Sequence, residues 1–145
     1  MASKITEKTK TVQLVKADAY AEATTYNGSA NASGLGVDVS GFNEALIIMN
    51  SGTATGTNTV TLVSSNDNTT SASTWDAISG ASFTAVTSAN DDAVQVARLN
   101  VAGDKKYVAV KSVVATNPCD FGVVAVLTKA SAEPVADYTS AVFDV

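Results

Sequence analysis

Short apolar segments with a two-residue period, separated by turn-forming residues, run through most of this chain. Six of them are expected to be strands: 12–15, 45–49, 59–63, 93–99, 106–111 and 121–127. They are rich in branched side chains, which fit a pleated surface better than a helix. The Gly, Asn and Asp clusters between them tolerate turn conformations. The pattern predicts an all-β domain.

Two of these segments contain no polar residue. Residues 45–49 and 123–127 are continuously apolar, whereas 59–63 alternates, with Val60 and Leu62 on one side. We therefore expect both faces of the two apolar strands to be covered. A two-layer sandwich covers one face of each sheet, so these strands favour self-association, although a place in the centre of the sandwich explains them equally well.

Residues 16–23 are rich in alanine and have helical propensity, but their apolar positions alternate, which favours an extended segment ended by residues 24–28. Residues 27–41 are expected to be a long loop with a short strand near 35–39.

The length of 145 residues suits a single domain. We divide the chain into a basic N-terminal arm (1–11), a β-sandwich (12–131) and a C-terminal docking segment (132–145). The last segment carries Tyr138 and Phe143, which are costly to leave in water.

Charge is distributed unevenly. The net charge is −5, and residues 1–16 carry four lysines against one glutamate, which makes them +3 and the remainder −8. The acidic total argues against nucleic acid as a partner. A basic arm on an acidic body can clamp an acidic partner, or fold back or remain solvated.

The residue types that most often catalyse reactions are scarce. The chain has no histidine and one cysteine, while Ala, Val, Thr and Ser occupy 77 positions. Hydroxyls without a neighbouring base are weak nucleophiles, and no phosphate-loop, dinucleotide or zinc pattern is present. We expect a non-enzymatic protein without cofactor or metal.

Three features were weighed as chemical sites. Asp91–Asp92 and the cluster 66–68 could offer oxygen ligands to calcium, but such residues are also good turn formers. Cys119 is expected to be a small semi-buried filler. No apolar stretch of signal-peptide or membrane-span length occurs, so synthesis in a cytoplasm is expected, with no membrane partner.

One passage resembles a known family. Residues 59–68 read as a strand and an Asn/Asp turn, 73–78 as a returning strand that begins with Trp75, and 105–111 as a later strand after a Gly-Asp turn. Over residues 44–115 this succession resembles small head proteins of tailed bacteriophages. The same hairpin is also similar to part of discoidin-type carbohydrate-binding sandwiches.

The phage resemblance implies a capsid decoration, or cement, protein. Such a protein would be an antiparallel β-sandwich, jelly-roll-like, with extended N- and C-terminal arms. It would bind the major capsid protein on the outside of the virion as a homodimer or homotrimer. The terminal segments supply the candidate capsid-binding residues, which are Lys4, Lys8, Lys10, Tyr138 and Phe143.

Two alternatives remain open. A carbohydrate-binding or tail-adhesin module would need an exposed aromatic platform, and its candidates are Trp75, Tyr20, Tyr26, Tyr107 and Tyr138. A tail-tube or head-completion protein is the second alternative.

Overall fold

A computed structural model describes residues 9–20, 24–28, 36–68, 75–103 and 105–130. Nine strands are formed by these residues: β1 (Lys10–Tyr20), β2 (Thr24–Gly28), β3 (Val37–Asp38), β4 (Phe42–Ala54), β5 (Thr57–Ser65), β6 (Asp76–Ser82), β7 (Val94–Asn100), β8 (Tyr107–Ala115) and β9 (Cys119–Ala130). The all-β prediction is confirmed.

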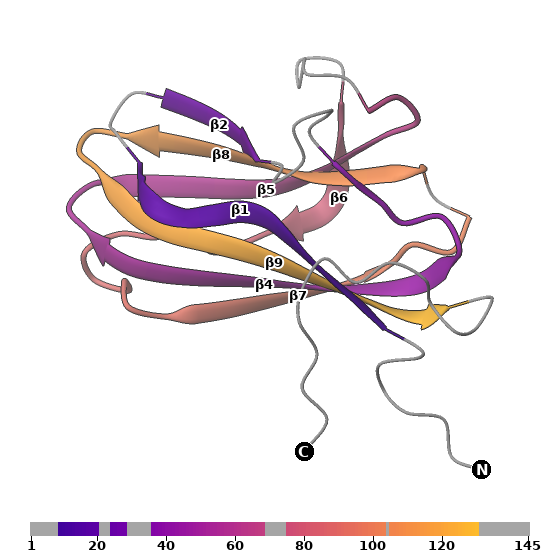
Figure 1. The fold of residues 1–145 in the computed structure, drawn as a ribbon. Coiled ribbons are helices and arrows are strands. Elements are labelled where there is room, and N and C mark those ends of the chain that lie inside the picture. Colours follow the sequence, from indigo (N-terminus) through magenta and orange to yellow (C-terminus); the bar gives the residue numbers. More distant parts are fainter. Residues whose placement is uncertain (1–8, 21–23, 29–35, 69–74, 104, 131–145) are drawn as a thin grey trace, which may run out of the picture.

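The strands form two antiparallel sheets that pack face to face (Figure 1). Sheet A has the order β1-β9-β4-β7, and sheet B has the order β2-β8-β5-β6. The short β3 pairs with β8 beyond the end of β2, along the same edge. The antiparallel β-sandwich expected from the sequence is therefore confirmed.

The pairing of strands is nested. β1 pairs with β9, β2 with β8, β4 with β7 and β5 with β6, so the first strand meets the last and each inner pair lies within the outer one. Such a path is that of a long hairpin rolled into two layers, as in jelly-roll sandwiches. Because of it, β1 begins and β9 ends at the same end of sheet A.

The core lies between the sheets and is built by alternation. On β4, Ala45, Ile47 and Met49 point inward and are fully buried, and β5 and β8 contribute the inward rows that begin with Val60 and Val108. Successive strand residues point to opposite faces, so one face of each strand supplies this core.

Segment 16–23 is extended as predicted in its described part, because Lys16–Tyr20 continues β1. The loop expected at 27–41 is wrong at its start, because residues 24–28, which were expected only to end the preceding segment, form β2 and pair with β8. Their Thr-rich sequence gives little apolar periodicity, and the ladder to β8 decides their conformation. The short strand expected near 35–39 is β3.

Trp75 directly precedes β6, as predicted, but it does not lie against the main core. Its ring is 6% exposed and packs with Val63 and Ala109 in a separate cluster. Ala109 lies between the inward-facing Val108 and Val110, so this cluster covers the outer face of sheet B. Gly36 adjoins the ring so closely that a Cβ there would come within 2.5 Å of it.

A polar pair interrupts the apolar core. The hydroxyl of Ser112 on β8 donates to Asn58 Oδ1 on β5 at 2.6 Å, and both residues are fully buried. Asn58 Nδ2 has no hydrogen-bond partner among the described residues. The backbone of Asn58 also exchanges two hydrogen bonds with Val86, which ties the 83–93 connection to the edge of β5.

Replacing Trp75 by alanine should lower the free energy of unfolding by about 3–5 kcal/mol, the usual cost of emptying a buried large aromatic site. Urea denaturation of parent and variant measures the change. A variant as stable as the parent would contradict the observed burial of the ring.

Replacing Ser112 by alanine should cost about 1–3 kcal/mol, because Asn58 Oδ1 then remains buried without a donor. The double variant Ser112→Ala/Asn58→Leu should recover part of that loss, since both polar partners are removed together. Ser79→Ala on exposed β6 is the control and should change stability by less than about 0.5 kcal/mol. A Ser112 variant equal to this control would refute the role of the pair.

Candidate functional site: the outer face of sheet A

The outer face of sheet A is apolar. Leu46 and Ile48 on β4 alternate with the buried core residues, as do Val124 and Val126 on β9, and all four are half-buried on the outside. In the ladder Leu46 stands opposite Val126, and Ile48 opposite Val124. The absence of polar residues from 45–49 and 123–127 thus places an apolar row on each side of the sheet.

The edge strand β7 extends this surface. Val96 pairs with Ile48, and Val94 with Asn50. Their side chains are 56% and 62% exposed, the highest values among the exposed large hydrophobic residues described. We call the surface formed by these six side chains the apolar face: Leu46, Ile48, Val94, Val96, Val124 and Val126.

The sequence showed that residues 45–49 of β4 and 123–127 of β9 are apolar on both faces, and covering of the outer face stays a prediction. Nothing in the sequence indicated that β7 adds to this outer surface. Its segment was expected to be a strand, and the valines of such a strand are normally assigned to the core. In the structure Leu99 faces inward and is buried, which puts Val94 and Val96, at an odd spacing from it, on the outside. If the sequence had shown that Leu99 faces inward, the outward facing of Val94 and Val96 would have followed from their spacing.

The outer face of sheet B differs. One end is covered by Trp75, and the remainder is mostly polar, with Thr59 and Lys111 exposed and Thr61 half-buried, although Val113 is 39% exposed there. The Thr61 hydroxyl donates to the Lys111 carbonyl at 3.3 Å. The two exteriors of the sandwich therefore have different chemistry.

One end of the apolar face carries a charged cluster. Arg98 Nη2 and Lys129 Nζ both donate to Glu44 Oε1, each at 2.6 Å. The Glu44 side chain is 22% exposed, while both cations are largely in solvent. The hydrogen bonds from Lys129 and then Arg98 lower the pKa of the Glu44 carboxyl. Two cations sharing one carboxylate leave this end with a net charge of +1.

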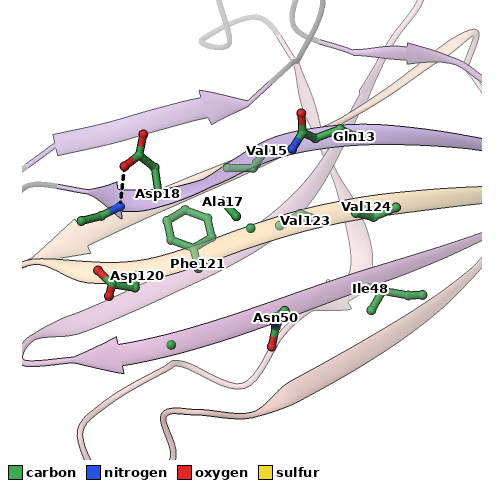
Figure 2. A pocket seen from close by; sticks show the side chains of 13 residues that line it. Gln13, Val15, Ala17, Asp18, Ile48, Asn50, Asp120, Phe121, Val123 and Val124 are labelled. Atoms are coloured by element: carbon green, nitrogen blue, oxygen red, sulfur yellow. Dashed lines mark hydrogen bonds between the residues drawn. The ribbon is translucent and has the colours of Figure 1, made fainter. Parts of the chain in front are cut away.

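The other end of sheet A contains a hollow, shown in Figure 2, of about 490 Å³ between β1, β9 and β4. Gly122 forms part of its floor, and a Cβ there would come within 2.9 Å of the Ala17 backbone. The register of β1 shifts on either side of Val15, which brings Ala17 over that glycine. Phe121 packs on Tyr20 with ring centroids 4.7 Å apart.

Carboxylates flank this hollow. Asp120 lies on β9 beside Gly52, and Asp18 lies on β1 (Figure 2). Asp18 accepts hydrogen bonds from Lys16 Nζ and from the Ala19 N–H, each at 2.9 Å. The Lys16 hydrogen bond is the largest cause of the lowered pKa of Asp18. Since Lys16 balances Asp18, Asp120 gives this end a net negative charge.

The residues weighed for calcium make hydrogen bonds to the backbone. Asp91 Oδ2 accepts from the Ala54 N–H at 3.0 Å, and Asn68 Oδ1 accepts from the Gly36 N–H at 2.9 Å. The described residues contain no group of three or more His, Cys, Asp or Glu positioned for a metal ion. Cys119 is buried, and burial raises the pKa of its thiol.

The predicted capsid-binding residues are only partly described. Lys10 opens β1 and pairs with Leu127, two residues before the expected start of the sandwich. Lys4, Lys8, Tyr138 and Phe143 lie outside the described residues. The segments that carry them, however, connect to neighbouring points of sheet A, because Lys10 pairs near the end of β9 and Ala130 pairs with Phe42.

The chain matches no model of a known protein family and no curated protein sequence. Within the part of the chain that the structure describes, no helix is long and apolar enough to span a membrane.

The contact of Glu44 with its two cations should make stability depend on pH. A carboxyl whose pKa is lowered on folding stabilises the fold above its ordinary value of 4.5 and loses that contribution as the pH falls through the lowered pKa. The stability difference between parent and Glu44→Gln should therefore be present at neutral pH and shrink below pH 4.5. Chemical denaturation of both proteins across pH measures it. A difference independent of pH would show that the ionised form of Glu44 contributes nothing.

Proposed function

We propose that this protein is a non-enzymatic structural protein of a phage virion, a decoration protein that binds the outside of the capsid and bridges major capsid protein subunits. The observation that carries the proposal is the common origin of the two terminal segments. Lys10 pairs with Leu127, and Ala130 ends β9 three residues later, so both segments leave sheet A at one end (Figure 1).

The two segments that start from this end of sheet A carry two kinds of candidate binding residue. The N-terminal segment supplies Lys4 and Lys8, and the C-terminal segment supplies Tyr138 and Phe143. Lysines give salt-dependent attraction to an acidic surface, while aromatic side chains provide apolar contact area. Two segments that start from neighbouring points can contact both sides of a seam between capsid subunits, which a single flat face cannot.

The mechanism is avidity. Each subunit makes modest contacts with the shell, and a decoration oligomer that holds several capsid subunits dissociates only when all its contacts open together. The sandwich itself serves as a rigid support, with its core residues buried between two sheets that pair over most of their length. Bridging of this kind resists the outward pressure of packaged DNA without touching the DNA.

The carbohydrate-binding alternative receives less support from the described side chains. Trp75 is buried on sheet B, Tyr20 packs on Phe121, and Tyr107 is half-buried beside Lys106. These rings do not form an exposed stacking platform, and the side chains of Tyr26 and Tyr138 are outside the described set.

Deleting residues 1–9 should leave the melting temperature of the sandwich nearly unchanged, because β1 begins at Lys10, and should weaken attachment to virions. Raising the salt concentration should weaken the parent more than the truncated protein, since exposed charge pairs are screened. Co-sedimentation with virions from the source of the sequence, measured against salt for both forms, tests this.

Two results would count against the proposal. Equal occupancy of the two forms at every salt concentration would show that the arm makes no contact with the shell. A full-length protein that stays in the supernatant at all salt concentrations would refute the decoration function itself.

A further inference from the structure

We infer that the apolar face is the interface of a two-fold homodimer, in which a second copy of this chain packs its own sheet A against it with the strands antiparallel. The inference deepens the proposed function, because it assigns a surface to the self-association that a decoration oligomer requires. Its chemistry is independent of the shell, and it can be tested on the purified protein.

The first argument is the apolar character of the face compared with the rest of the exterior. Val94 and Val96 are more than half exposed, and they continue the row of Ile48 and Val124 across three strands. Contiguous exposed apolar patches on soluble proteins mark interaction sites. The outer face of sheet B, by contrast, is covered by Trp75 at one end and is mostly polar elsewhere, with Val113 as its exposed large apolar side chain among the described residues.

The second argument is area. The outer face of sheet A has four strands and extends along β4 from Glu44 to Gly52, and the apolar face occupies three of these strands. At about 4.8 Å between strands and about 3.4 Å per residue, this surface measures roughly 600 Å² on each copy. Two copies then bury about 1,200 Å², which reaches the lower end of the range for stable specific interfaces.

The third argument is charge, which selects the orientation. The end near Glu44 has a net charge of +1, with Arg98 and Lys129 exposed, and the end near Gly52 carries Asp120. Parallel stacking of two copies would place like charges together. Antiparallel stacking places the cationic end of each copy on the acidic end of the other, and a two-fold axis satisfies both ends at once.

The position of the axis follows from the register. Ile48 lies at the centre of the apolar face, four residues from Glu44 and four from Gly52. Glu44 pairs with Thr128, next to Lys129, while a Cβ on Gly52 would lie 3.2 Å from Asp120. A two-fold axis that crosses the strands at Ile48 exchanges the position of Glu44 along the strands with that of Gly52. It therefore places Lys129 of one copy opposite Asp120 of the other.

The first test is Val96→Glu, with Val113→Glu as its matched control. Val113 is 39% exposed on β8 of sheet B, so the same substitution is made on the opposite exterior. Sedimentation equilibrium at micromolar concentration should find a dimeric parent. The dissociation constant should rise by at least about tenfold for Val96→Glu and stay unchanged for Val113→Glu. A monomeric or trimeric parent, or equal effects of the two variants, would overturn the inference.

The second test is a charge exchange. Asp120→Lys and Lys129→Asp should each weaken the dimer, and the double variant should regain most of the parental affinity because the pair is restored in reverse. Losses that simply add in the double variant would rule out the antiparallel arrangement.

The third test excludes the other occupant of the same face, the chain's own C-terminal segment. Deleting residues 132–145 should leave the dimer intact. If the parent is monomeric and dimerises only after this deletion, the segment covers the face and the inference is wrong. Binding to virions is measured separately for the parent and for Val96→Glu. A dimeric parent that does not bind virions refutes the proposed function alone. A monomeric Val96→Glu variant that binds virions as well as the parent refutes a need for the dimer.

Discussion

The pairing of β4 with β9 is the interaction on which the rest of the structure depends. It is the longest ladder in the molecule, from Phe42 opposite Ala130 to Ala54 opposite Cys119, and it occupies the centre of sheet A. Both strands are apolar at successive positions, so a slip of one residue would still bury apolar side chains. The neighbouring strands extend this ladder on both sides, because β1 pairs with β9 and β7 pairs with β4.

That register divides one apolar sequence into two surfaces with different uses. Ala45, Ile47 and Met49 fill the core, and Leu46 and Ile48 remain on the outside. On the outer face of sheet B, the apolar residues Val63 and Ala109 are covered by Trp75 of the same chain. The outer face of sheet B is thus partly covered by the chain itself, whereas the outer face of sheet A keeps Val94 and Val96 exposed, and this difference is the basis for proposing association through sheet A.

The proposed roles of the molecule also depend on the nested chain path. Because β1 and β9 are the first and last strands and pair with each other, the two terminal segments start side by side. Strands joined in simple succession would not bring the two ends of the chain together in this way. The proposed dimer face lies on sheet A, and the terminal segments connect to its strands β1 and β9, so the proposal assigns self-association and attachment to a shell to one layer of the fold.

The sequence by itself determined the β class, the place of most strands and the apolar character of both faces of β4 and β9, because period and side-chain size act locally. It could not reveal that residues 24–28 are a strand, that Trp75 covers sheet B, or that Val94 and Val96 face outward with Arg98 beside Glu44. Those features depend on which strand lies next to which, and pairing between residues as distant as Glu44 and Lys129 is decided only when the whole core is packed. Local preference selects strands, and only the tertiary structure decides their neighbours and their facing.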